Sequence, residues 1–332
     1  MNNRFSTFNG PIFLVGMPRS GTKLLRAILN HHPDISIPET ETEFFPHWVA
    51  NWTSYGDLSN YAVFQKFAAR CKLLPYFRYK QDRKHLTDVE RWYKNCRSFQ
   101  PNDVFEALLK TDLSVSDFDD TIWGDKSPSY VTHIGLLKQH FPEARIIHII
   151  RDVRDYCLSI NKAWGKNMFR AAQRWNDDVS SARAQGLNMS GDYIEVKYED
   201  LLDSPRASVQ KICRFLGVDL VESMFELSGD IENLGDARGH KEILKSNTGK
   251  YKDNLSESKR RTIEAIAGTT LVAVGYDNLI SVESKRLGKC RLSYYQGLDG
   301  IRLITRAVRE RGIIGAVQFY ATYFVVSGNR RS

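Results

Sequence analysis

Residues 12–25 read Ile12-Phe13-Leu14-Val15-Gly16-Met17-Pro18-Arg19-Ser20-Gly21-Thr22-Lys23-Leu24-Leu25. The apolar start predicts a buried strand, the segment with two glycines, a proline and a serine predicts a tight turn, and an amphipathic helix follows. A strand, a glycine-containing loop and a helix start form an anion cradle, because backbone N–H groups there are unpaired and the helix dipole adds positive charge. Arg19 and Lys23 add two full charges, so we expect a phosphate or a similar oxyanion as ligand.

The spacing of the two glycines indicates which oxyanion binds. In the nucleoside triphosphatase loop G-x-x-x-x-G-K-[ST], the lysine contacts the β- and γ-phosphates and the hydroxyl binds magnesium. Gly16 and Gly21 have this spacing, but Thr22 stands in the lysine position and Lys23 in the hydroxyl position. The magnesium-binding hydroxyl is therefore out of place. We expect a phosphate-like group that is held by arginine and lysine without a required metal.

The composition is that of a globular protein with a basic charge balance. The chain has 332 residues, of which 42% are hydrophobic and 26% charged, and its formal net charge is +8. This charge suits an anionic ligand, and the absence of zinc-finger spacing and of RNP-like aromatic runs speaks against nucleic acid. The five cysteines are scattered without a C-x-x-C pair, which indicates a reducing, cytoplasmic compartment. We expect neither a signal peptide nor a membrane-spanning helix.

The loop also resembles that of a known family. Residues 18–25 read P-R-S-G-T-K-L-L. This is similar to the P-R-S-G-T-[TS]-L-[LM] loop of the sulfotransferases that use 3′-phosphoadenosine 5′-phosphosulfate (PAPS), in their bacterial and tyrosylprotein branches. The chain departs from that pattern at Lys23, where a hydroxyl residue is usual. The resemblance implies that the 5′-phosphosulfate is held by Arg19, Ser20, Gly21, Thr22 and Lys23, with Arg19 also acting in catalysis.

An acidic loop after the first helix contains the candidate general base. Residues 32–45 read H-P-D-I-S-I-P-E-T-E-T-E-F-F, and the prolines exclude a helix there. The bacterial members of the resembled family often carry H-P-D-I followed by P-E-T-x-F-F. Matching from the right nominates Glu41, and matching from the left nominates Glu39. Both stay candidates, with Glu41 ahead, beside the alternative that the loop is only a solvated acidic stretch.

A lysine follows a short apolar pair near the middle of the chain. Residues 124–130 read G-D-K-S-P-S-Y. A lone lysine in a loop is ordinarily exposed and inert. This segment, however, is similar to the family's [DN]-K-[TSD]-P, in which the lysine reaches the sulfonate and the bridging oxygen. The resemblance therefore implies a catalytic role for Lys126.

A second buried strand, predicted at 145–150, ends at a candidate phosphate site. Arg151, Asp155 and Ser159 recur every four residues, so a helix starting here would place them along one side. The carboxyl end of a parallel strand is where α/β sheets bind ligands. The segment resembles the family's R-D-x-x-D-x-x-x-S element, which implies that Arg151 and Ser159 hold the 3′-phosphate of PAPS.

Two later segments extend the resemblance. After a short alternating strand at 193–196, Y-E-D-L at 198–201 is similar to a family segment whose tyrosine lies near the adenine. For Tyr198 a structural role is an equal alternative. The basic loop at 246–256 resembles G-[RK]-[WY]-[RK]-x-x-L-[ST], which closes over the nucleotide and implies binding by Gly249 and Lys250. The resemblance covers about residues 11 to 276.

These elements predict an α/β fold with a P-loop-like parallel sheet flanked by helices. We place the sulfotransferase domain at 1–280, with an aromatic-rich helical insertion at 47–121 on the acceptor side. Residues 281–332 form a helical C-terminal extension. Its segment 301–326 has basic flanks around apolar and aromatic residues, so it either contacts an anionic membrane at its inner face or docks on the domain's own core.

The resemblance implies sulfuryl transfer from PAPS to an acceptor hydroxyl or amine, with PAP as the product and without a metal. Lys126 would stabilise charge on the leaving oxygen, and Glu41 or Glu39 would take the acceptor proton. Two alternatives are a nucleotide kinase or triphosphatase, which needs a magnesium site, and a non-catalytic nucleotide-binding protein on the same scaffold. The sequence leaves open whether the acceptor is a small molecule, a carbohydrate, a lipid or a peptide, and it leaves the oligomeric state open.

Overall fold

The computed structural model describes residues 8–115, 121–189, 191–227, 247–278 and 285–327. Its strands are β1 Ile12–Gly16, β2 Ile35–Ser36, β3 Ile122–Lys126, β4 Arg145–Ile150 and β5 Tyr193–Lys197. Its helices are α1 Thr22–Asn30, α2 Phe45–Asn51, α3 Tyr61–Cys71, α4 Pro75–Asp82, α5 Val89–Asn95, α6 Pro101–Leu113, α7 Ile134–His140, α8 Val153–Trp164, α9 Met168–Gly186, α10 Tyr198–Asp203, α11 Pro205–Leu216, α12 Tyr251–Asn254, α13 Glu257–Ala273 and α14 Lys289–Ser327. Short 3-10 helices are η1 Trp52–Tyr55, η2 Pro128–Thr132 and η3 Glu222–Phe225.

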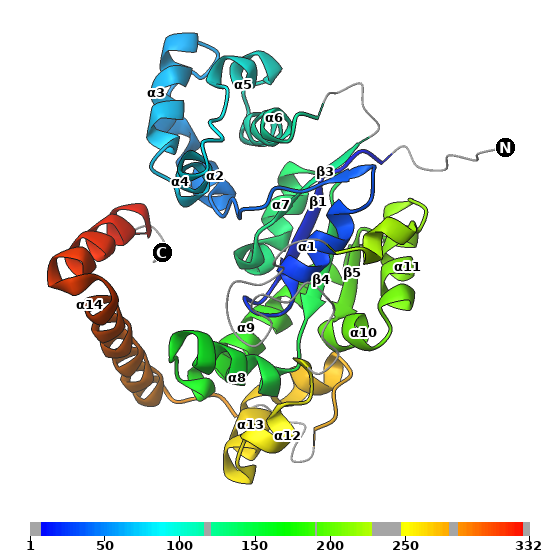
Figure 1. The fold of residues 1–332 in the computed structure, drawn as a ribbon, viewed down its shortest axis with the longest axis vertical. Coiled ribbons are helices and arrows are strands. Elements are labelled where there is room, and N and C mark those ends of the chain that lie inside the picture. Colours follow the sequence, from blue (N-terminus) through cyan, green and yellow to red (C-terminus); the bar gives the residue numbers. More distant parts are fainter. Residues whose placement is uncertain (1–7, 116–120, 190, 228–246, 279–284, 328–332) are drawn as a thin grey trace.

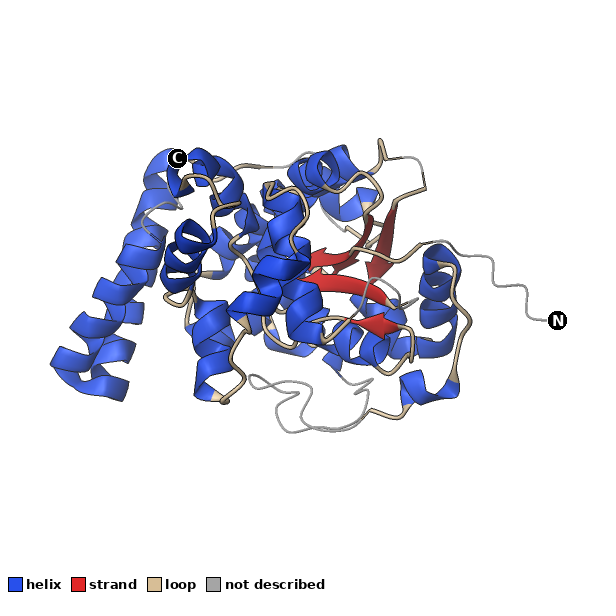
Figure 2. Ribbon diagram, turned by 90° about the horizontal axis from the view of Figure 1, so that it is seen from above, coloured by secondary structure: helices blue, strands red, loops and turns tan. Residues whose placement is uncertain are grey.

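The strands form a parallel sheet with β1 at its centre. The order is β2-β3-β1-β4-β5, and each neighbouring pair is parallel. β1 pairs with β4 from Ile12 opposite Arg145 to Gly16 opposite Ile149. Because parallel neighbours require crossover connections, the helices lie between the strands in the chain and cover the sheet, as Figure 2 shows. The predicted α/β fold class is confirmed.

Alternating side chains of β1 belong to two different cores. Ile12 and Leu14 pack with the apolar residues of α1, α10 and α11. Phe13 and Val15 pack in the larger core, which includes residues of α7, α8, α9 and α13. Successive side chains of a strand point to opposite faces, so a strand that is apolar at every position is buried on both faces.

Helices α2 to α6 lie together at one end of the molecule, beyond β3 (Figure 1). Their core is aromatic: the Trp48 and Trp92 rings are stacked with centroids 6.2 Å apart, and Trp48 also packs against Phe67 and Phe105. The segment predicted as a helical insertion, 47–121, is helical over most of the part that the structure describes. Its role on the acceptor side stays a prediction.

Helix α14 docks on the α8–α9 connection with its first half. Asp299 accepts hydrogen bonds from Asn167 N at 2.7 Å and Arg170 Nη1 at 2.8 Å, and Arg302 Nη1 donates to Gly165 O at 3.0 Å. The helix bends at Gly312, whose φ is 70°. The side chains of 316–326 lie outside the described residues, and so does that part of the membrane prediction for 301–326. None of the described helices is long and apolar enough to cross a membrane.

Candidate active site

The carboxyl ends of four neighbouring strands supply the predicted site residues. β1 leads into the loop 17–21, β3 ends at Lys126, β4 is followed by Arg151, and β5 by Tyr198. The sheet order changes direction at β1, because β2 and β3 lie on one side of it and β4 and β5 on the other. Open α/β sheets bind ligands at such a switch point. The topology therefore gathers residues from distant parts of the chain at the carboxyl ends of the strands.

The loop between β1 and α1 is shaped by two positive φ angles. Arg19 has φ 72° and Gly21 has φ 94°. Gly21 has no room for a side chain, since an added Cβ would lie 2.3 Å from Cδ2 of Tyr198. Ser20 is buried, and its Oγ has no hydrogen-bond partner among the described residues. A buried hydroxyl without a partner is costly, so this one suits a ligand oxygen.

Arg151 connects the loop to the predicted 3′-phosphate and adenine residues. It donates to the carbonyl oxygen of Arg19 at 3.1 Å and to that of Asn247 at 2.9 Å. Its guanidinium lies 4.6 Å from the ring centroid of Tyr198, whose hydroxyl accepts from Asn247 Nδ2 at 2.7 Å. Arg19 Nε in turn donates to Ser159 Oγ at 3.4 Å. The structure thus brings Arg19, Arg151, Ser159 and Tyr198 together.

Asp155 anchors the basic glycine loop. Its carboxylate accepts from Gly249 N at 2.6 Å and from Tyr251 N at 2.8 Å, so Lys250 lies between two anchored residues. Burial raises the pKa of Asp155, although the charge of Arg151 opposes this. From the sequence, Asp155 was predicted only to lie on the same side of the helix as Arg151 and Ser159, and no binding partner was assigned to it. The R-D-x-x-D spacing was the available signal for a closer role.

Lys126 and Glu41 form an ion pair at the end of β3. Lys126 Nζ lies 2.6 Å from Glu41 Oε1, and the lysine side chain is 1% exposed whereas that of Glu41 is 35% exposed. Burial lowers the pKa of Lys126, the carboxylate of Glu41 opposes this, and the charge of Lys23 lowers it further. Glu39 lies elsewhere, since its Oε2 accepts from the hydroxyl of Tyr79 in α4 at 3.0 Å. Of the two candidate bases, Glu41 therefore faces the lysine.

A buried hydrogen-bond cluster lies behind this pair. Thr42 Oγ1 lies 3.0 Å from Asp125 Oδ2, to which it donates, and 2.8 Å from the hydroxyl of Tyr130. Thr42 N donates to Ser127 Oγ at 3.0 Å. All four residues are buried. Burial raises the pKa of Asp125 to about 7, although hydrogen bonds from Ser127 and Thr42 lower it.

The cluster holds the backbone on either side of the ion pair. Thr42 follows Glu41 in the chain, and Lys126 stands between two members of the cluster. The two segments that carry the ion pair are therefore joined by side chains that cannot move independently. Sequence reasoning missed Thr42 and Tyr130, because nothing in the local pattern shows that these two hydroxyls meet.

The arrangement combines a group of cationic and hydrogen-bond-donating side chains with a carboxylate–ammonium pair. Arg19, Lys23 and Arg151 supply cationic groups, and Ser20 Oγ and Arg151 Nε are buried donors without partners in the described part of the chain. Such a donor set fits a ligand with several anionic oxygens. The described ranges hold no group of three or more His, Cys, Asp or Glu residues that could bind a metal ion.

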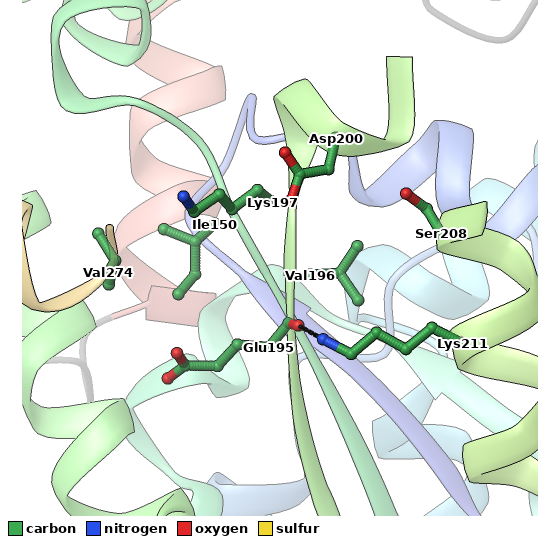
Figure 3. A pocket seen from close by; sticks show the side chains of 8 residues that line it. All are labelled: Ile150, Glu195, Val196, Lys197, Asp200, Ser208, Lys211 and Val274. Atoms are coloured by element: carbon green, nitrogen blue, oxygen red, sulfur yellow. Dashed lines mark hydrogen bonds between the residues drawn. The ribbon is translucent and has the colours of Figure 1, made fainter. Parts of the chain in front are cut away.

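A separate cavity of about 240 Å³ lies beside the edge strand β5 (Figure 3). Lys211 reaches across it, and its Nζ donates to the carbonyl oxygen of Glu195 at 3.1 Å. A lysine in this place satisfies an edge carbonyl and blocks strand pairing. None of the predicted site residues lines the cavity, so it lies outside the candidate active site.

Comparisons with known proteins agree in one family. The model described as "Sulfotransferase family" matches residues 11–222. A protein of Caenorhabditis briggsae named "Putative protein-tyrosine sulfotransferase" is 25% identical over 295 residues, which are 82% of this chain and 91% of that protein. Protein-tyrosine sulfotransferase 1 of Danio rerio is 25% identical over 220 residues, which are 62% of this chain and 53% of that protein.

Solved structures show the same fold. The sulfotransferase domain from the Synechococcus PCC 7002 olefin synthase has a TM-score of 0.54 and 24% identity, and the likeness covers 82% of this chain and 97% of that domain. The sulfotransferase domain from the curacin biosynthetic pathway has a TM-score of 0.53 and 20% identity, and covers 82% of this chain and 100% of that domain. The family match includes the loop, Lys126, Arg151 and Tyr198, but it ends before Gly249 and before α14.

Proposed function

This chain belongs to the sulfotransferase family, and from this premise we propose that it moves a sulfuryl group from PAPS to an acceptor hydroxyl or amine. The observation that carries the proposal is the contact of 2.6 Å between the buried Lys126 and Glu41, beside the anion-binding loop. One contact thereby offers both a cation for the leaving group and a base for the acceptor. The reaction needs these two roles side by side.

The donor would be held by groups at the ends of β1 and β4. The loop N–H groups, Arg19 and Lys23 would bind the 5′-phosphosulfate, and Ser20 Oγ would find its missing partner there. Arg151 and Ser159 would bind the 3′-phosphate, and Arg151 Nε is a buried donor with none of the described groups opposite it. When bound, PAPS supplies a sulfuryl group on a phosphosulfate anhydride.

The residues of the chain would then position the transfer. The acceptor oxygen attacks sulfur, the bond between sulfur and the bridging phosphate oxygen breaks, and that oxygen keeps the electron pair and leaves as part of PAP. Glu41 takes the acceptor proton, and the ammonium of Lys126 stabilises the charge that grows on the leaving oxygen. As in phosphoryl transfer, positioning and charge neutralisation do most of the catalysis.

The names of the relatives favour one acceptor class. Two relatives are named protein-tyrosine sulfotransferases, and we propose a phenolic hydroxyl, on a peptide or protein, as the first acceptor to test. A cytoplasmic location stays a proposal. The five cysteines are free thiols, which supports a reducing compartment.

The test is transfer of label from ³⁵S-PAPS to tyrosine-containing peptides and to a small-molecule and lipid extract. We expect labelled product with the full chain, and a rate about 10²–10³-fold lower with Lys126→Met, because a preorganised charge is removed. Lys211→Met, in the separate cavity, is the matched control and should keep full activity. The proposal fails if no fraction is labelled, or if Lys126→Met is as active as Lys211→Met.

A further inference from the structure

A cavity of about 260 Å³ lies between α8, α9 and α14 and reaches the phosphate-binding loop at Pro18. Tyr156 and Trp164 of α8 form an aromatic wall, and Leu292 and Asp299 of α14 close the other side. Pro18 precedes Arg19, which places the cavity next to the loop proposed to hold the phosphosulfate. The cavity is not part of the donor contacts described above.

Most charges in the cavity already have partners. Arg170 Nη1 pairs with Asp299 at 2.8 Å, and Arg174 Nε pairs with Asp178 at 3.0 Å. Asp177, the remaining acidic group of the lining, pairs with a guanidinium outside it. The acidic side chains of the lining are therefore already neutralised.

Two hydrogen-bond donors of the lining have no partner. Tyr156 is 2% exposed, and its hydroxyl makes no hydrogen bond within the described part of the chain. Lys166 lies over the Trp164 ring, 5.0 Å from the centroid, and forms no ion pair with any described carboxylate. Burial lowers the pKa of Lys166, the charges of Arg174 and Arg170 lower it further, and the carboxylate of Asp299 opposes this. An anionic oxygen in the cavity would accept hydrogen bonds from both donors.

The lining also includes Arg174 of α9. Burial lowers the pKa of Arg174, but Tyr156, Asp178 and Glu43, in this order, raise it on balance. Glu43 is thus within electrostatic range of the lining, and it stands two residues after the candidate base Glu41. A molecule in the cavity would lie against Pro18, next to the loop proposed to hold the phosphosulfate.

Helix α14 completes this cavity, although it lies beyond the family match. Asp299, which is 3% exposed, binds Asn167 N and Arg170, and so fixes the helix against the start of α9. The cavity therefore combines family residues of α8 and α9 with residues of the C-terminal extension. This gives the extension a binding role that differs from a membrane anchor.

We propose that this cavity binds the acceptor and recognises an oxyanion on it, a carboxylate or a phosphate-type group, through Lys166 and the hydroxyl of Tyr156. The proposal rests on the proposed function and names a substrate class for it. The aromatic wall holds the body of the acceptor, the oxyanion sits at Lys166, and the acceptor hydroxyl is directed toward the phosphosulfate loop.

The experiment measures equilibrium binding by titration calorimetry, with the full chain saturated with PAP so that no turnover occurs. Three matched phenols serve as probes: 4-hydroxyphenylacetate, 4-hydroxybenzylphosphonate and the neutral 4-hydroxyphenylacetamide. We expect at least one anionic probe to bind about tenfold or more tightly than the amide, since charge-assisted hydrogen bonds are strong. The carboxylate and phosphonate arms distinguish the two oxyanion types.

Lys166→Met should remove the preference for the anion, and Tyr156→Phe should reduce it. Lys162→Met is the control, because Lys162 is an exposed lysine of α8, four residues before Lys166, and does not line the cavity. Equal binding of all three probes, absence of binding, or equal loss of preference in Lys162→Met and Lys166→Met would overturn the inference. The melting temperature with PAP is recorded for each variant. If PAP raises the melting temperature but the probe test fails, only the acceptor site is rejected. If the wild type does not bind PAP, the proposed function is rejected.

Discussion

The proposed donor side and the proposed acceptor side of this molecule are built differently. The donor side, from loop 17–21 to Arg151 and Tyr198, stands at the ends of adjacent strands of one sheet. The proposed acceptor side combines the acidic loop, the helices α2–α6 and the first half of α14, which come from distant parts of the chain (Figure 1). The register of the sheet fixes the positions of the donor-side residues. Side-chain contacts between helices and loops fix the positions of the acceptor-side residues.

This difference indicates which side of the site can change more readily by substitution of single residues. Strand ends are held by backbone hydrogen bonds, so the same short motifs can place the same groups in many relatives. Contacts such as Glu39 with Tyr79, or Asp299 with Arg170, depend on single side chains. We therefore expect substitutions on the acceptor side to change turnover and acceptor choice while donor binding persists.

The largest effect is expected at Glu41. Glu41→Gln should lower turnover by on the order of a hundredfold or more, because the proton acceptor is lost, while PAP binding stays intact. Glu39→Gln is the matched control, since Glu39 bonds Tyr79 instead of Lys126. Initial rates with ³⁵S-PAPS decide between them. A dead Glu39→Gln beside an active Glu41→Gln would assign the base to the other glutamate.

The second effect concerns the pH dependence of protein stability. It is expected from Asp125, in the buried cluster that joins the segments carrying Glu41 and Lys126. Burial raises the pKa of Asp125 to about 7 in the folded protein. Between pH 4 and this value the folded state keeps a proton that the unfolded state has lost, so the free energy of unfolding falls as pH rises. Asp125→Asn should remove on the order of 4 kcal/mol of that fall. Urea denaturation between pH 4 and pH 8 measures this free energy for the wild type and for Asp125→Asn. If it changes with pH in the same way in both proteins, the raised pKa of Asp125 is contradicted.

A smaller effect is expected at Thr42. Thr42→Val removes the hydroxyl that bonds Asp125 and Tyr130, and should lower kcat about tenfold through misplacement of Glu41. Thr42→Ser keeps the hydroxyl and should restore most of the activity. The affinity for PAP should not change in either variant. Equal kcat values for the two variants would show that the cluster serves stability alone.

Much of the donor side was predictable from the sequence because its signals are local. The apolar run at 12–15, the glycines of the loop and the strand at 145–150 each predict an element by themselves, and the parallel sheet then brings their carboxyl ends together. The fold class and the family were predicted from these segments and are confirmed. The roles of the individual site residues stay predictions.

The rest depends on contacts that no local pattern encodes. The choice between Glu39 and Glu41 depends on a lysine 85 positions away from Glu41 in the chain. Asp155 binds the backbone of a loop that is 94 residues away. The docking of α14 depends on contacts such as those of Asp299, which in the sequence is an ordinary polar residue of a helix.

The most direct test of the account is calorimetric binding of PAP and of 5′-AMP to the wild type and to Arg151→Met. Arg151 and Ser159 are proposed to bind the 3′-phosphate, which PAP carries and 5′-AMP lacks. We expect PAP to bind the wild type at least about tenfold more tightly than 5′-AMP, and Arg151→Met to lose most of that difference. Equal affinity of the wild type for PAP and 5′-AMP would contradict the claim that this sheet edge is a PAPS site.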